Sequence, residues 1–214
     1  MSPEQPPLIY VIAGVNGAGK SSIQGAAILR AHGHYYNPDE AAATLRATNP
    51  KLTQIEANSI AWHNGVALLK TAIQEKLDYS FESTLGANTI PGLLRDAANG
   101  GFNVRVWYVG LSSPELHISR VRRRVSRGGH PISESDIRRR YDASRANLIN
   151  LIPHLTGFKV FDNSAEADPY EGQPPKPELL LHVERGQILA PSDLSMTPAW
   201  AEPIVAAAIK HEQH

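Results

Sequence analysis

Three observations predict an α/β fold in which a mostly parallel sheet is flanked by helices. The apolar segment 8–13 leads directly into a glycine-rich loop, as a buried strand leads into a helix in such folds. Short apolar segments then alternate along the chain with longer segments whose apolar residues recur at helical spacing. Acidic or hydroxyl side chains follow several of the short segments, where parallel strands would end. This alternation is typical of strands joined by crossover helices.

The length of the chain bounds its domain organisation. A chain of 214 residues can bury one sizeable core and is short for two complete domains. We therefore expect a single domain over 1–214, with a flexible amino-terminal segment at 1–7 and a carboxyl-terminal extension at 165–214.

Charge and composition argue against several classes of partner and site. Lys and Arg together number 21, as do Asp and Glu, so no net positive field recruits nucleic acid or an anionic membrane. The absence of cysteine excludes disulfides, thiolate metal sites and cysteine nucleophiles. Residues 1–7 lack the basic and apolar regions of a signal peptide, and no apolar run approaches about 18 residues. We expect a soluble, cytoplasmic protein that binds neither nucleic acid nor membrane.

The loop after the first strand predicts a binding site for nucleotide phosphates. It fits the pattern GxxxxGK(S/T) at every constrained position. Glycines let successive backbone N–H groups curve around an anion, and the helix expected at 22–30 would point its positive end at the phosphates. The lysine would reach the β- and γ-phosphates of the bound nucleotide, and Ser21 would ligate Mg²⁺. The expected nucleotide contacts are Gly14, Asn16, Gly17, Ala18, Gly19, Lys20, Ser21 and Ser22. A glycine-rich turn with a chance lysine is disfavoured by the apolar segment before the loop.

A second strand is expected at 34–36, followed by a helix that begins near Pro38. Proline fits the first turn of a helix, and Asn37 fits the N-cap position. Asp39 therefore follows a strand at the edge of the sheet where α/β proteins bind ligands. Asp39 could instead simply complement the helix dipole, and position alone does not separate the two interpretations.

A long helix and a third strand follow. Apolar residues at three-, four- and seven-residue spacing predict a helix over 52–77 that packs on the sheet through Ile55, Trp62, Val66, Leu69, Ile73 and Leu77. The strand at 78–85 ends in an acid and two hydroxyls, Glu82, Ser83 and Thr84. Two acids at the same edge as the phosphate loop favour a substrate pocket lined by Asp39, Glu82, Ser83 and Thr84.

The next helix is expected over 88–99, stopped by Gly100 and Gly101, and a buried strand over 104–111. That strand carries no terminal acid, so the usual acidic partner of Mg²⁺ is missing there. If the protein holds the metal beyond Ser21, Asp39 is the nearest source.

A helix over 114–127, capped by Ser113, carries an arginine stripe opposite Ile118, Val121 and Val125. We interpret Arg122 and Arg124 as a solvated face and expect Arg120 to contact ATP. Arg127-Gly128-Gly129-His130 differs, because an arginine followed by a flexible glycine pair is typical of a lid over a polyphosphate.

A second helix begins at Ser133, where Ser133 and Asp136 resemble a capping box. Its apolar face runs through Ile137, Tyr141, Leu148, Ile152 and Leu155. On the helical wheel Arg140 lies beside that face and Arg139 points away. Arg140 is therefore the arginine expected to contact phosphate.

The rest of the chain begins with a predicted strand at 157–161, a polar turn at 162–164 and a surface connection at 168–177. A hairpin of 179–184 and 187–189 is expected to close one edge of the sheet, and a final helix to begin at 197. Turn chemistry explains 162–164, and contact with the adenine is the alternative.

Together, the phosphate loop, Asn37-Pro38-Asp39-Glu40, Phe81-Glu82-Ser83-Thr84, Arg127-Gly128-Gly129-His130, Ile137-Arg138-Arg139-Arg140-Tyr141 and Asp162-Asn163-Ser164 resemble the zeta toxin family. The resemblance covers roughly 8–164, and its lid motif is more specific than its phosphate loop, which is shared by many unrelated enzymes. It implies a P-loop kinase fold with an arginine-bearing helical lid, and an enzyme that uses ATP and Mg²⁺ to phosphorylate the 3′-hydroxyl of UDP-N-acetylglucosamine.

The resemblance also implies roles and a partner. Lys20 would bind phosphates, Asp39 would be the base on the sugar hydroxyl, and Glu82 would hold the sugar nucleotide. Arg127 and Arg140 would stabilise the transferring group. The protein would be the toxin of a toxin–antitoxin pair, with a protein antitoxin as partner.

Two other hypotheses remain open. One is a P-loop kinase for another small hydroxyl compound, such as a nucleoside or an antibiotic, and only the resemblance separates it from a sugar-nucleotide kinase. The other is an ATP-binding regulatory module without turnover. Asp39 argues against the module, which needs no carboxylate at an acceptor site.

Overall fold

The computed structural model describes residues 5–20, 35–165 and 176–213. Several sequence predictions therefore lie outside the described residues: the helix at 22–30, the contacts of Ser21 and Ser22, strand residue His34, and most of the connection at 168–177.

The fold is α/β and is built on a seven-stranded sheet in the order β2-β3-β1-β4-β5-β6-β7. Its parallel part comprises β1 (Leu8–Ala13), β2 (Tyr35–Tyr36), β3 (Tyr79–Ser83), β4 (Asn103–Gly110) and β5 (Gly157–Asp162). Because β3 pairs directly with β1, the chain crosses over between β2 and β3, and the strand that carries Glu82 adjoins the strand that feeds the phosphate loop.

The predicted hairpin closes the opposite edge of the sheet. The strands β6 (Glu178–Glu184) and β7 (Gln187–Ala190) pair antiparallel, and β6 pairs antiparallel with β5. Arg185 and Gly186 turn the chain with φ of 49° and 77°, a left-handed conformation that glycine adopts without strain.

The helices within the described residues are α2 (Pro38–Thr48), α3 (Gln54–Glu75), α4 (Thr89–Asn99), α5 (Pro114–Ser126), α6 (Glu134–Leu151), the short 3₁₀ helix η2 (Ile152–His154) and α7 (Glu202–Glu212). The three predicted caps are confirmed: the side chains of Asn37, Ser113 and Ser133 accept backbone N–H bonds from the first turns of α2, α5 and α6. The final helix begins later than the predicted residue 197, because Pro198 and Ala201 first form a turn closed by a 2.8 Å hydrogen bond between Ala201 N and Pro198 O.

The predicted face of α3 is wrong in part. Ile55, Trp62 and Leu77 are 81%, 40% and 53% exposed. The buried face consists largely of small residues, namely Ala57, Ala61, Gly65, Val66, Leu69 and Ala72. Small residues are needed because the helix lies close to its neighbours: a Cβ on Gly65 would come within 2.8 Å of the Tyr36 ring. Periodicity found the helix but favoured its larger side chains as the core.

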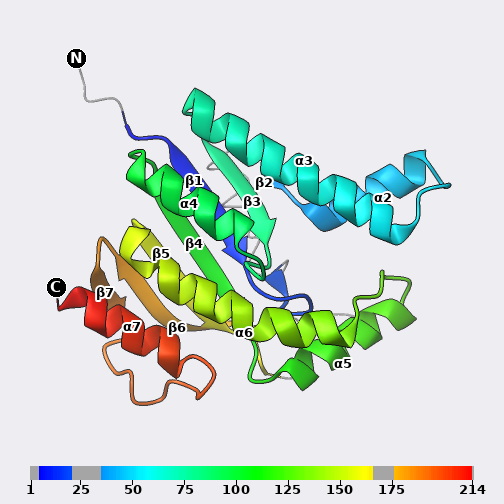
Figure 1. Ribbon diagram of the computed structural model, residues 1–214. Coiled ribbons are helices and arrows are strands. Elements are labelled where there is room, and N and C mark those ends of the chain that lie inside the picture. Colours follow the sequence, from blue (N-terminus) through cyan, green and yellow to red (C-terminus); the bar gives the residue numbers. More distant parts are fainter. Residues whose placement is uncertain (1–4, 21–34, 166–175, 214) are drawn as a thin grey trace.

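One hydrophobic core joins the sheet to the helices α3, α4, α6 and α7, which lie across one face of the sheet (Figure 1). The carboxyl-terminal hairpin and α7 contribute Leu181 and Ile204 to this same core. Trp200, just before α7, packs so closely on β4 that a Cβ on Gly110 would lie 2.2 Å from the indole. None of the described helices has the length and hydropathy needed to span a bilayer.

Candidate active site

A pocket of about 330 Å³ lies at the carboxyl ends of β1, β2 and β3, the edge at which parallel α/β sheets bind ligands. On one side of it extend α2 and the beginning of α3, and on the other extend α5 and the beginning of α6 (Figure 1). Its lining includes Asn16 and Lys20 from the phosphate loop, Asp39 from α2, Glu82 from β3 and Arg140 from α6. Residues separated by as many as 124 positions in the sequence therefore surround one space.

The glycines of the phosphate loop are required by its geometry. Gly14, Gly17 and Gly19 have φ of 144°, 83° and 85°. A Cβ on Gly14 would come within 2.3 Å of the carbonyl oxygen of Val109. The loop is tied to the neighbouring strand by a 3.1 Å hydrogen bond from Gly14 N to Ser83 O.

Two buried side chains hold the loop from behind. The ring Nδ1 of His117, which is 1% exposed, lies 2.9 Å from the carbonyl oxygen of Asn16. Burial lowers the pKa of His117 to about 4, so the imidazole is neutral at pH 7 and its Nδ1–H donates to that oxygen. Asn163 donates from Nδ2 to Ala18 O at 2.8 Å. The sequence predicts no function for His117, because its one signal is a polar residue on the apolar face of α5.

The turn at 162–164 thus serves the phosphate loop through Asn163. Its predicted turn chemistry is confirmed, since Ser164 N donates to Asp162 Oδ1 at 3.1 Å. Whether this turn contacts an adenine stays a prediction.

Lys20 and Glu82 face each other at the bottom of the pocket. Lys20 donates from Nζ to Gly14 O at 2.9 Å, and its Nζ lies 3.8 Å from Glu82 Oε2. Glu82 is 8% exposed, and burial raises its pKa, while Lys20 opposes that shift. Asn37, the cap of α2, donates to Glu82 Oε1 at 3.2 Å. Because β3 lies between β2 and β1, Glu82 is carried by the strand next to the phosphate-loop strand.

The hydroxyls of Ser83 and Thr84 line the pocket, as predicted, and also shape its wall. Ser83 Oγ accepts a 3.0 Å hydrogen bond from Leu85 N, and Thr84 Oγ1 accepts one of 3.3 Å from Gly86 N. These bonds stabilise a tight turn after β3 in which Leu85 has a φ of 50°.

Asp39 lies in the first turn of α2, at the rim of the pocket, with its side chain 46% exposed. Two cationic or potentially cationic groups approach its carboxylate: Arg124 Nη1 lies 3.9 Å from Oδ2, and His130 Nε2 lies 3.7 Å from Oδ1. The interpretation of Arg124 as a purely solvated residue is therefore wrong. The wheel phase placed it outward, but the start of α2 lies on that side and brings Asp39 within 3.9 Å of its guanidinium.

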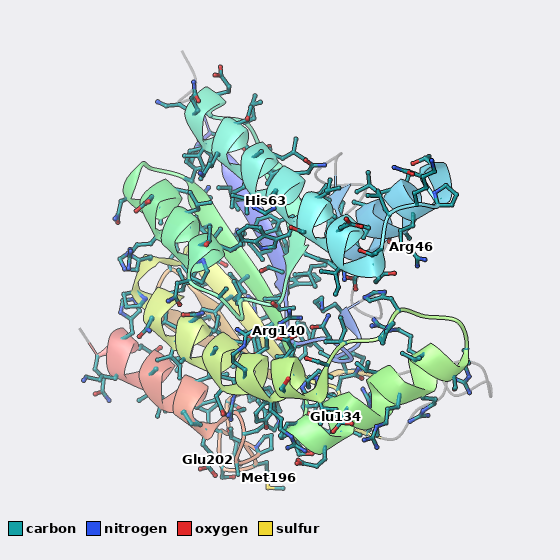
Figure 2. All side chains as sticks on the ribbon, turned by 45° about the vertical axis from the view of Figure 1, so that its right-hand side comes forward. Arg46, His63, Glu134, Arg140, Met196 and Glu202 are labelled. Carbon is teal, nitrogen blue, oxygen red and sulfur yellow. The ribbon has the colours of Figure 1, made fainter. Side chains whose placement is uncertain are left out.

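Arg140 lies on the inward side of α6, as the helical wheel predicts, whereas Arg139, predicted to point away, is exposed but also borders the pocket. Arg140 donates from Nη1 to Asn16 Oδ1 at 2.7 Å, whereas Arg139 pairs with Asp136 of its own helix at 2.6 Å. In Figure 2 Arg140 lies near the middle of the molecule, between α6 and the strand ends, and Glu134 lies toward the outer end of the same helix. Gly86 makes room for Arg140, because a Cβ there would come within 2.6 Å of Arg140 Cγ.

The other predicted arginines lie on α5 or at its end. Arg120 donates from Nη2 to Ala165 O at 2.9 Å. Arg127 is exposed and forms the C-cap of α5, followed by Gly128 with a φ of 90°. Arg122 pairs with Glu134 on the solvent side, as predicted.

The described residues contain no group of three or more His, Cys, Asp or Glu side chains that could hold a metal.

Comparison with known proteins shows the family to which this chain belongs. Residues 1–173 match the family model described as Zeta toxin. An uncharacterized protein of Haemophilus influenzae is 32% identical over 132 residues, which are 60% of this chain and 88% of that protein.

Two solved structures share the fold. The AvrRxo1-ORF1:-ORF2 complex with ATP has a TM-score of 0.66 and 14% identity over 94% of this chain, and the match spans 63% of that chain. A structure of the PezAT chromosomal toxin–antitoxin system of Streptococcus pneumoniae has a TM-score of 0.55 and 12% identity, over 99% of this chain and 89% of that one. Since the family model covers most of its length, the protein belongs to the zeta toxin family, and its fold is that of a P-loop kinase.

Proposed function

We propose that this zeta toxin family kinase transfers the γ-phosphoryl group of ATP to the 3′-hydroxyl of UDP-N-acetylglucosamine or a related sugar nucleotide. The observation that carries the proposal is a single pocket in which the phosphate-loop lysine, Lys20, and two carboxylates, Asp39 and Glu82, face one space. A nucleotide-binding loop alone would need no carboxylate on the acceptor side. Family membership supports the same reaction.

Each side chain has a distinct task in this reaction. The loop and Lys20 hold the ATP phosphates, with Ser21 as a ligand of the accompanying Mg²⁺, which neutralises phosphate charge. As the acceptor oxygen bonds to phosphorus, its proton passes to Asp39, and ADP leaves with the electron pair of the broken P–O bond. Arg140 and Arg127 offset the charge that develops on the transferring group. Glu82, Ser83 and Thr84 bind hydroxyl and amide groups of the acceptor.

A protein antitoxin is the proposed partner, because the family and the fold are shared with a toxin–antitoxin system. The cytoplasm, where both ATP and sugar nucleotides are made, is the proposed location. We also propose that 1–214 forms one kinase domain, since its carboxyl-terminal hairpin shares the core of the sheet.

A second candidate is a kinase for a smaller hydroxyl compound, such as a nucleoside or an antibiotic. The pocket volume of about 330 Å³ favours it, because this value lies at the low end of the roughly 300–1,000 Å³ of ligand sites. A screen of sugar nucleotides, nucleosides and aminoglycosides with ATP and Mg²⁺, read by mass spectrometry, tests both. Phosphorylated sugar nucleotide supports the first proposal, phosphorylation of only another compound supports the second, and no transfer to any acceptor contradicts both.

A further inference from the structure

The Asp39 carboxylate is approached from the lid side by two residues to which the proposed mechanism gives no task. Arg124 Nη1 lies 3.9 Å from one carboxylate oxygen and His130 Nε2 lies 3.7 Å from the other. Both distances exceed a hydrogen bond by a few tenths of an ångström. Hydrogen bonds at active sites are often long before substrates bind and shorten in the reacting complex.

Arg124 and His130 form one unit although they lie on different elements. Arg124 donates from Nη2 to the carbonyl oxygen of His130 at 3.2 Å, and Gly129 N donates to Arg124 O at 3.0 Å. A Cβ on Gly129 would meet Arg124 Cγ at 2.6 Å, so glycine is required for this contact. The segment after α5 is therefore folded back onto Arg124, and the two side chains that approach Asp39 are held together by these contacts.

Each of the two side chains also retains a nitrogen that is inaccessible to solvent and has no hydrogen-bond partner among the described residues: Arg124 Nε and His130 Nε2. A buried donor without a partner costs free energy. An acceptor within a few tenths of an ångström of reach would recover that cost, and for His130 the oxygen at that distance is Asp39 Oδ1.

We propose that Arg124 and His130 are positioning residues that fix the Asp39 carboxylate toward the acceptor hydroxyl when the lid segment 127–131 closes. The inference rests on the proposed role of Asp39 as the base. Asp39 needs such support, because its side chain is 46% exposed in the first turn of α2. The segment that delivers Arg127 to the phosphates would thereby also align the base, so that transfer begins only when the lid is closed.

The contact itself can be tested without turnover. Burial lowers the pKa of His130, and the charge of Asp39 opposes that shift. In an NMR titration, with the resonance assigned through His130→Asn, Asp39→Asn should therefore move the His130 pKa further down. Arg122→Gln changes an arginine on the solvent face of α5 and should leave the His130 pKa unchanged. A His130 pKa that does not respond to Asp39→Asn overturns the proposal.

The positioning role is tested by double-mutant cycles with ATP and UDP-N-acetylglucosamine. Arg124→Gln and His130→Asn should each lower kcat by about 10- to 100-fold, the size expected of a misplaced catalytic group, with the KM for ATP little changed. In an Asp39→Asn background the same changes should cost less than about twofold, because the residue they position is gone. Arg122→Gln is the matched control. If the wild type transfers phosphate and the losses of kcat in the double mutants are additive, the positioning role is contradicted. If the wild type transfers phosphate to none of the acceptors named above, Asp39 is not the base; the proposed function fails, and the positioning role fails with it.

Discussion

Arg140 donates a 2.7 Å hydrogen bond to the side-chain oxygen of Asn16, which ties α6 to the phosphate loop. Burial lowers the pKa of Arg140, but the pKa of an arginine lies so far above 7 that the guanidinium keeps its charge. The guanidinium is thus held beside the loop, where a phosphoryl group would move.

This placement predicts which arginines matter for transfer. Arg140→Ala and Arg127→Ala should lower kcat far more than they weaken ATP binding, since a positioned arginine can contribute about 10³ to 10⁵ in rate. Arg139→Ala should do little, because Arg139 is paired with Asp136 on its own helix although it borders the pocket. Steady-state kinetics beside ATP calorimetry measure both effects. Equal losses at Arg139 and Arg140 would contradict the assignment.

Lys20→Ala should weaken ATP binding and abolish transfer with the fold intact. Lys20 is the only charged side chain within the loop, and it now bridges Gly14 O and Glu82. Calorimetry beside a melting curve gives the comparison. A folded variant with unchanged ATP affinity would rule out this loop as the nucleotide site.

His117 predicts a pH dependence of stability. The unfolded chain binds a proton at this histidine below about pH 6.5, whereas the folded protein resists it until about pH 4. Between these values the unfolded state binds more protons, so the free energy of unfolding falls as the pH is lowered, by about 3 kcal/mol in total from this group.

His117→Gln retains a donor for Asn16 O but does not titrate. Urea denaturation between pH 7 and pH 4 should show a shallower loss of stability for this variant than for the wild type. Parallel curves for the two proteins would show that His117 is not buried as a neutral imidazole.

Trp62 predicts a contact with the acceptor. It lines the pocket while 40% exposed, and His63 packs edge-on against it with ring centroids 4.9 Å apart. Stacking of a base on an aromatic residue contributes about 1–3 kcal/mol, so Trp62→Ala should raise the acceptor KM about fivefold or more without lowering kcat. Leu68→Ala, at an exposed residue of the same helix that does not line the pocket, is the control. Equal effects of the two changes would remove Trp62 from the acceptor site.

Sequence patterns predicted the helices and strands more accurately than they predicted the contacts of each side chain. The caps at Asn37, Ser113 and Ser133 were predictable because they depend on residues within a few positions. The inward direction of Arg140 followed from helical phase alone. The order of the strands in the sheet could not be predicted, since no local sequence signal indicates that β3 lies between β2 and β1. That order is what brings Glu82 beside Lys20.

Other contacts were missed because they join distant segments through shape. Arg124 lies beside Asp39 of α2 although 85 positions separate them, and His117 contacts Asn16 across 101 positions. The face of α3 was misjudged because close approach selects Ala and Gly, whose burial is invisible to a hydrophobicity pattern.

The proposed mechanism depends on Asp39 accepting the proton of an acceptor hydroxyl while Glu82 binds the acceptor. This division of tasks is tested most directly by incubating wild type, Asp39→Asn and Glu82→Gln with ATP, Mg²⁺ and UDP-N-acetylglucosamine, and locating the new phosphate by NMR. Loss of a general base typically costs about 10² to 10⁴ in rate. We expect wild-type product on the 3′-oxygen, a loss of that size in Asp39→Asn with both substrates still bound, and mainly a raised acceptor KM in Glu82→Gln. Wild-type turnover in Asp39→Asn would contradict it.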